Sequence, residues 1–246
     1  MKLDILLPNS LSEIPLSRYQ EFVAMKEKSN DEELIANKMI QIFCGLKLGE
    51  VAKIKVKDLN GLIKHFTEVF SERPQLVRQF RIKDIEFGFI PNLEEISFGE
   101  YVDIEHHLQN WSTYHKAMAV MFRPIKEKYK DKYSIIDYEP NEDMQELMKF
   151  APLDVAISAS FFLQSLLSEL LKATLHYLKN ELTKTKDLTN FRKEFSLANN
   201  GVGIQAYMDS LTEILQNSIR LQNTDLLNVL PIYRSRNKKT KSKAVN

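Results

Sequence analysis

The sequence predicts a mainly α protein: a multi-helix domain with a long central buried helix and a small β-hairpin. Glycine is scarce, at 7 of 246 residues, against a usual share of roughly 7%. Hydrophobic residues make up 43% of the chain, which suffices for a core. Residues 155–168 form an uncharged, largely apolar run. Together these observations favour helices packed around one long helix.

Spacing and composition divide the chain into three predicted parts. Short amphipathic helices occupy residues 1–76, the main helical domain with the hairpin occupies 77–233, and a basic tail occupies 234–246. Length alone permits one large domain or two small ones.

The first part is predicted to hold one short strand, Leu3–Leu7, and three helices. Ser17 and Asn30 each precede a glutamine or glutamate by three residues, which is the spacing of a helix N-terminus. Asp58 is expected to cap the third helix, and Pro74 to stop it. We expect these helices to span about 17–28, 30–43 and 59–71.

The hairpin is predicted from QFRIKDIEFGFIP at 79–91, in which apolar residues alternate on either side of Lys83-Asp84. Residues 133–138 predict one further strand. The mixed-charge stretch between them, IKEKYKDKY at 125–133, is interpreted as a solvated face and not as a nucleic-acid patch.

A helix is expected to begin at the capping box formed by Ser97 and Glu100 and to continue until Pro124 stops it. Its apolar stripe follows alternating steps of three and four residues. The stripe comprises Tyr101, Ile104, Leu108, Trp111, His115, Met118 and Phe122.

Three histidines and several acids in this helix raise the question of a metal or acid/base site. Glu100, Asp103 and His107 share one face, but the two-histidine i, i+4 pattern of zinc helices is missing. Asp103 and His107 are one turn apart, as are His106 and Asn110, so local polar partners are present. We interpret these histidines as structural and predict no metal ligands.

The long central helix is predicted to begin near Pro152 and Asp154 and to carry two apolar stripes. Its uncharged run of fourteen residues is shorter than the roughly 20 that a bilayer requires, so we expect a core helix and no stable membrane span. Trp111, Phe162 and Leu166 are predicted to be buried. A further helix is expected over 204–219.

Charge is distributed unevenly along the chain. The tail RSRNKKTKSKAVN contains six basic residues and no acid, so residues 1–233 carry 28 basic against 33 acidic residues, a net of −5. The tail is expected to contact DNA or an acidic protein surface, or to remain a solvated terminus. The candidate contact residues are Arg234, Arg236, Lys238, Lys239, Lys241 and Lys243.

Sequence patterns of known catalytic chemistry are missing. The chain has no Walker loop, no GxSxG and no HExxH, and GVGIQA at 201–206 follows a polar joint where a dinucleotide site requires a strand. Cys44, the single cysteine, is expected to be a packed thiol. The start, MKLDILLPNS, does not resemble a signal peptide. We therefore expect a non-enzymatic protein without a cofactor, made in a cytoplasm.

Three segments resemble a protein of tailed bacteriophages that infect Bacteroidetes, notably the crAss-like phages. They are FGFIPNLEEISFGEYVDIE at 87–105, YHKAMAVMFRPI at 114–125 and PLDVAISASFFL at 152–163. The resemblance covers residues 80–180, less than half of the chain, and none of its motifs is catalytic.

This resemblance implies a non-enzymatic virion protein. The first expectation is an internal cargo protein, stored in the head or tail and ejected with the genome. The alternatives are a head-tail ring or tail structural protein and a tail-assembly chaperone absent from the mature virion. The implied partners are other phage virion proteins, in an oligomeric arrangement within the particle, with DNA as a further partner of the basic tail. The implied location is the virion, and the host cytoplasm during assembly.

Overall fold

The computed structural model describes residues 5–108, 110–184 and 212. These residues form eight α-helices, three short 3-10 helices and four β-strands. In chain order they are η1 (Leu11–Glu13), α1 (Leu16–Lys26), α2 (Glu32–Cys44), α3 (Leu48–Val51), α4 (Val56–Phe70), β1 (Gln79–Ile82), β2 (Ile85–Phe89), η2 (Leu93–Glu95), α5 (Phe98–Leu108), α6 (Tyr114–Met121), β3 (Phe122–Tyr129), β4 (Lys132–Ile135), α7 (Glu142–Leu147), η3 (Met148–Phe150) and α8 (Leu153–Lys184).

The four strands form one antiparallel sheet in the order β1-β2-β3-β4. Lys83, in the β1–β2 turn, has a positive φ of 53°, a conformation that tight hairpin turns require. The ring of Tyr133 on β4 lies so close to Gly88 on β2 that a Cβ there would clash with it. The Tyr133 hydroxyl donates to the Phe89 carbonyl at 2.7 Å, so Tyr133 spans the sheet from β4 to β2.

The predicted fold class, a multi-helix domain with a small β-hairpin, is therefore wrong about the sheet, although the further strand predicted over 133–138 overlaps β4. The hairpin exists over Gln79–Phe89, but it is half of a four-stranded sheet. The second half consists of β3 and β4, which include the stretch that we interpreted as a solvated charged face. The side chains of β3 become exposed from Lys126 onward. This part of the strand is mostly charged and lacks the alternation of apolar and polar residues by which a half-buried strand is recognised.

The predicted single helix through residues 101–122 is interrupted at Asn110. The Asn110 side chain accepts hydrogen bonds from the Ser112 amide at 2.9 Å and from the Ser112 hydroxyl at 2.7 Å, and the Thr113 amide donates to the Asn110 carbonyl. Such side-chain bonds give the backbone an alternative to helical pairing. The chain consequently forms α5 and α6, and Phe122 begins β3 before Pro124 is reached.

Two smaller predictions for the N-terminal part are also wrong. The described residues of the predicted first strand, 5–7, have no strand pairing. Asp31, not Asn30, caps α2 and accepts from the Glu33 and Leu34 amides, while Pro15 precedes α1 and Lys55 precedes α4 without side-chain caps. The helices themselves lie where the apolar spacing predicts them. The helix expected over 204–219 lies outside the described residues apart from residue 212, and the domain boundaries at 76 and 233 stay predictions.

Aromatic rings dominate the core beneath α1, α2 and α4. The Phe43 ring centroid lies 5.3 Å from that of Phe22, 5.5 Å from Phe66 and 5.1 Å from Phe70, and all four side chains are buried. Arg18 donates to the Phe43 carbonyl at 2.9 Å. Cys44 is buried beside this cluster, as the sequence predicted, and burial raises the pKa of its thiol to about 11.

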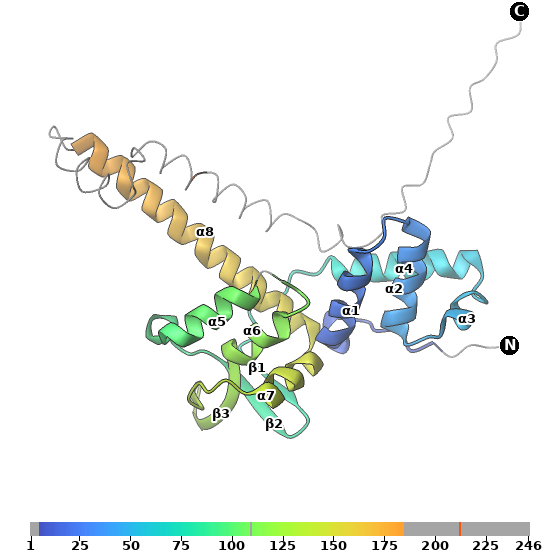
Figure 1. Ribbon diagram of the computed structural model, residues 1–246, viewed down its shortest axis with the longest axis horizontal. Helices are drawn as coiled ribbons and strands as arrows, with labels where there is room; N and C mark the ends of the chain where they lie inside the picture. Colours follow the sequence, from blue (N-terminus) through green and yellow to red (C-terminus); the bar gives the residue numbers. More distant parts are fainter. Residues whose placement is uncertain (1–4, 109, 185–211, 213–246) are drawn as a thin grey trace, which may run out of the picture.

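The beginning of α8 connects the N-terminal helices to the sheet. Leu153 donates its amide to the Ile14 carbonyl, and Leu16 donates to the Ala151 carbonyl, both at 2.9 Å. The Phe162 ring meets Phe89 of β2 edge-on at 5.8 Å. Figure 1 shows the first turns of α8 inside the body of the protein and the remainder extending well beyond it.

The prediction that α8 is buried throughout is wrong for one face of its second half. Residues 153 and 155–159 are buried, but Leu166 is 43% exposed, Leu170 63% and Tyr177 62%. Leu171 and Leu175, on the opposite face of the same half, are buried. Phe162 and Trp111, also predicted to be buried, are partly buried. Apolar spacing identifies the helix correctly, but it does not show which part of the helix is covered by other elements of the protein.

Among the described helices, Leu153–Tyr177 within α8 is long and apolar enough to cross a membrane, as judged by length and composition alone. Its first turns, however, lie in the protein core. A bilayer-spanning position would remove those side chains from the core, so the packing favours a core helix with a projecting end.

We predict that Phe43→Ala lowers the free energy of unfolding by about 3–5 kcal/mol, because it opens a cavity between three other buried rings. Chemical denaturation at a single pH measures the loss. Phe150→Ala is the matched control, since Phe150 is 65% exposed and its truncation should change the free energy by less than about 0.5 kcal/mol. Equal losses in the two variants would contradict this description of the core.

Candidate functional site

Helix α5 exposes three large apolar residues, while Ile104 and Leu108 pack against the core. Phe98 is 82% exposed, Tyr101 50% and Val102 42%, and their i, i+3, i+4 spacing places them on one face. The opposite face carries Glu100, which is buried. A helix face with three exposed large apolar residues and a buried glutamate opposite departs from the usual amphipathic pattern of a surface helix. Tyr101 was predicted to belong to the buried stripe, and this prediction is wrong.

A buried ion pair explains the orientation of α5. Arg123 of β3 contacts a Glu100 carboxylate oxygen at 2.7 Å, with both side chains almost wholly shielded from water. The other Glu100 oxygen accepts from the Ser97 amide at 2.6 Å, while the Ser97 hydroxyl accepts from the Glu100 amide. The predicted capping box is thus confirmed, and its glutamate also serves as the partner of a distant arginine.

A second polar contact extends this cluster toward the sheet. The Tyr138 hydroxyl donates to the Asp103 carboxylate, and the Arg123 guanidinium lies 5.9 Å from the centroid of the Tyr138 ring. Burial, together with the neighbouring Asp103 carboxylate, raises the pKa of the Tyr138 hydroxyl above its usual range. Two carboxylates therefore fix the inward face of α5: Glu100 contacts Arg123, and Asp103 contacts Tyr138.

An open cleft of about 470 Å³ lies beside this cluster. It is lined by η2, the start of α5 and the segment that follows β4, with Glu95, Glu100 and Asp137 among its acids and Arg123 as its cation. The buried Arg123 Nε has no hydrogen-bond acceptor among the described residues. Since Glu100 already neutralises Arg123, the cleft as a whole is acidic.

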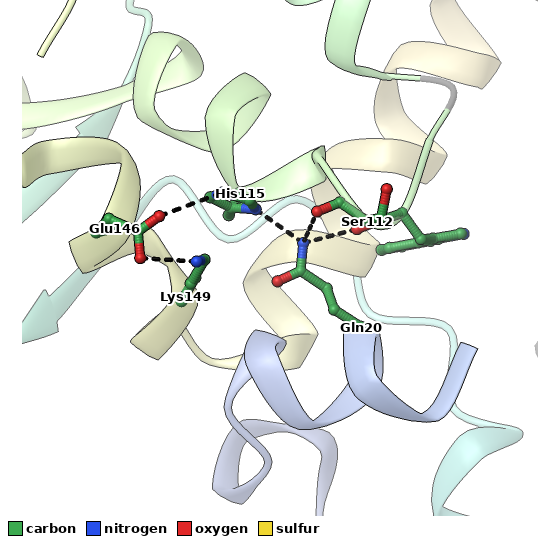
Figure 2. Close-up of polar contacts among 6 residues, drawn as sticks. Gln20, Ser112, His115, Glu146 and Lys149 are labelled. Carbon is green, nitrogen blue, oxygen red and sulfur yellow. Dashed lines mark hydrogen bonds and ion pairs between the residues drawn. The ribbon is translucent and has the colours of Figure 1, made fainter. Parts of the chain in front are cut away.

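A separate polar network surrounds His115, which is buried on α6. Figure 2 shows Gln20 of α1 directed toward His115 from one side and Glu146 facing it from the other. Gln20 Nε2 lies 3.0 Å from His115 Nδ1 and 2.6 Å from the Trp111 carbonyl oxygen. Glu146 Oε1 lies 3.9 Å from His115 Nε2, and Lys149 contacts the other Glu146 oxygen at 2.7 Å.

These contacts assign the tautomer of His115. The Gln20 amide nitrogen is only a donor, so Nδ1 accepts from it and the ring proton is on Nε2, facing Glu146. Burial, followed by the positive charge of Lys149, lowers the pKa of His115 to about 4, although Glu146 acts in the opposite direction. His115 is therefore neutral near pH 7 and serves to join α1 to α6.

His106 and His107, the other two histidines considered as metal ligands in the sequence, lie outside this network. His106 and His107 at the end of α5 contact each other, with ring centroids 4.6 Å apart. Burial and the adjacent His106 lower the pKa of His107. Among residues 5–108 and 110–184, no group of three or more histidine, cysteine, aspartate or glutamate side chains has the arrangement of a metal site.

The predicted contact residues of the tail lie outside the described residues. They are Arg234, Arg236, Lys238, Lys239, Lys241 and Lys243. The features that the structure brings together are instead the Glu100–Arg123 pair and the Gln20–His115 contact, neither of which was predicted. Their partners are separated by 23 and 95 residues respectively, and no local pattern links them.

Both polar clusters have a clear structural role. Within the two clusters, Arg123 Nε is the one buried side-chain nitrogen or oxygen of the described residues that has no hydrogen-bond partner; Tyr19 Oη, His107 Nδ1 and Gln164 Oε1 lack one outside them. The arrangement is suited to holding elements in place and to presenting an acidic cleft beside an apolar helix face. Comparisons with protein-family models, with curated proteins and with solved structures found no match.

We predict that Arg123→Met destabilises the protein by about 3–5 kcal/mol, because it leaves the Glu100 carboxylate buried without its cation. Adding Glu100→Gln should restore part of the loss, since the remaining group is then neutral. Lys128→Met is the control: Lys128 pairs with Glu86 at 2.9 Å, but both side chains are partly exposed, so the expected loss is below about 1 kcal/mol. Denaturant titration of the parent chain and the three variants measures these losses; an Arg123→Met loss no larger than the control loss would contradict the buried pair.

We predict that the free energy of unfolding falls as the pH is lowered from about 6.5 to about 4. The pKa of His115 is about 4 in the folded protein against 6.5 unfolded, so the unfolded chain binds the proton first and stability is fully present only above this window. Because Glu146 is 63% exposed, solvent screening reduces the expected loss to about 1–3 kcal/mol.

Chemical denaturation at pH 7, 5.5 and 4.5 measures this dependence. His115→Gln provides the comparison, since glutamine does not titrate and the part of the loss due to His115 should vanish. His65→Gln is the matched control, because His65 Nε2 contacts the Pro8 carbonyl oxygen outside this network. A His115→Gln variant with the same pH dependence as the parent chain would contradict this interpretation.

Proposed function

We propose that this chain is a non-enzymatic virion protein of a tailed bacteriophage, an internal cargo protein stored in the head or tail and ejected with the genome. The proposal is supported by the resemblance of three segments to a crAss-like phage protein. Those segments contain α6, most of α5, parts of β2 and β3 and the start of α8, so they include the two central strands of the sheet in part and the helices beside them.

The observation that carries a binding role is the projecting half of α8. Leu166, Leu170 and Tyr177 are exposed on one face of a helix that extends beyond the body of the protein (Figure 1), while Leu171 and Leu175 on its other face are buried. Large apolar residues grouped on one projecting element mark an interaction surface more often than a free one. Other phage proteins are the partners that the resemblance implies, in an oligomeric particle.

The same observation favours one alternative, a tail-assembly chaperone. A chaperone binds the apolar segments of tail proteins before they assemble, and an exposed helix stripe offers a surface for such a segment. A head-tail ring or tail structural protein would use the same surface to contact its neighbours. The three roles differ in whether the protein stays in the mature particle and in whether it leaves the particle at infection.

Mass spectrometry of purified particles tests the proposal. A cargo protein is present in mature virions and is missing from particles that have ejected their genome. A ring or tail protein remains in both, and a chaperone occurs in infected cells but in neither kind of particle. Retention in ejected particles, or absence from mature virions, would overturn the cargo assignment.

We further predict that Leu166→Ser with Leu170→Ser and Tyr177→Ser lowers incorporation into particles without unfolding the protein. Exposed sites of this kind change the free energy of unfolding by less than about 0.5 kcal/mol each. Glu169→Ala with Lys172→Ala is the matched control, because both residues are exposed on α8 but lack apolar side chains. Normal incorporation of the triple variant would remove the α8 surface from the proposed function.

A further inference from the structure

The outward face of α5 has no partner among the described residues. Phe98, Tyr101 and Val102 project from it, and Phe98 is 82% exposed. The Glu100–Arg123 pair holds the opposite face inward, so α5 cannot turn to bury these side chains without breaking that pair. The apolar surface is thus a fixed property of the fold.

Acidic residues are concentrated in two segments, one within and before α5 and one beside it. Residues 94–105 contain five acids and no lysine or arginine, and residues 137–143, DYEPNED, contain four more. The hydrogen bond between Tyr138 and Asp103 joins the two segments, and both line the same cleft. We define the α5 surface as Phe98, Tyr101 and Val102 together with the exposed acids Glu94, Glu95, Glu105, Asp137, Glu139, Glu142 and Asp143.

One segment of this chain has the complementary composition. Residues 226–243, LLNVLPIYRSRNKKTKSK, contain six large apolar residues followed by six cations, with no acid. The apolar residues match the exposed face of α5, and the cations match its acidic surroundings. The body otherwise carries an excess of acids, so this segment is the principal cationic part of the chain.

The chain is long enough to bring this segment back to α5. Helix α8 has 32 residues and is therefore about 48 Å long. The connection from its end to residue 226 comprises residues 185–225, which reach roughly 140 Å when fully extended. A tethered segment also has a high effective concentration at its own docking surface compared with a second copy in dilute solution.

We propose that residues 226–243 dock on the α5 surface of the same molecule, with the apolar part against Phe98, Tyr101 and Val102 and the cations against the surrounding acids. In this state the tail is withheld from DNA and from other acidic partners. Such partners must compete with the α5 surface for the tail. This proposal does not depend on the phage assignment.

Zero-length carbodiimide cross-linking of the full chain, followed by mass spectrometry, tests the proposal. The reagent joins lysine amines to carboxylates in direct contact, so we expect links from Lys238, Lys239, Lys241 and Lys243 chiefly to acids of the α5 surface. The links should weaken at high salt. A mixture of isotope-labelled and unlabelled protein distinguishes links within one molecule from links between two.

Matched variants test whether the cross-links depend on the α5 surface in particular. Glu94→Gln, Glu95→Gln and Glu105→Gln together remove three exposed charges and should lower the yield of tail links to the remaining acids of the surface about tenfold. Phe98→Ser with Val102→Ser should lower it as well, although these substitutions leave every charge in place. The control removes three exposed acids elsewhere, by Glu72→Gln, Glu127→Gln and Asp131→Asn, and should leave the yield unchanged.

Three results would overturn the proposal. Tail links spread evenly over all exposed acids would indicate a solvated tail. Mixed labelled–unlabelled links in the proportion expected for random pairing of two chains would assign the surface to the tail of a second copy. Equal yields in the triple variant and its control would show that the tail does not bind this surface.

Discussion

The contact between Arg123 and Glu100 determines how the sheet half of the protein is arranged. Two opposite charges shielded from water are stable only while they remain together, so the pair fixes the rotation of α5 about its axis and its position against β3. The exposed aromatic face and the acidic cleft both result from that rotation. If α5 followed the usual amphipathic rule, its phenylalanine and tyrosine would face the sheet and Arg123 would have no nearby carboxylate of α5. The exposed apolar face is therefore a consequence of the buried pair.

A different kind of polar contact joins the N-terminal helices to the rest. Gln20 extends from α1 to the Trp111 carbonyl and to His115, while the backbone of residues 14–16 pairs with that of residues 151–153. Apolar packing alone tolerates small rotations between helices, whereas a buried amide must meet its acceptors at one geometry. The aromatic cluster around Phe43 packs the N-terminal helices against one another, and the polar contacts specify how those helices are placed on the rest of the protein.

Local patterns in the sequence predicted most helices, the first hairpin and the capping box at Ser97. These features depend on residues a few positions apart, which is the distance over which periodicity and capping act. A strand was predicted near β4, but β3 was missed because it carries charges where a search expects alternation, and because its pairing with β2 depends on residues far away in the sequence. Asn110 did carry a local signal, an Asn followed by Ser and Thr, but the regular stripe on either side of it outweighed that signal. The candidate site could not be predicted, since Glu100 and Arg123 are partners only once α5, α6 and β3 are in place.

The reactivity of Cys44 toward an alkylating reagent can report local opening of the core. The thiol is buried at the end of α2, and its pKa of about 11 leaves very little thiolate at neutral pH. It is the single cysteine of the chain, so alkylation at one position requires the α2 end to separate from the aromatic cluster. The modification rate thus measures how often that part of the core opens, without any engineered probe. Substitutions in distant elements can be ranked by how much they accelerate this one reaction.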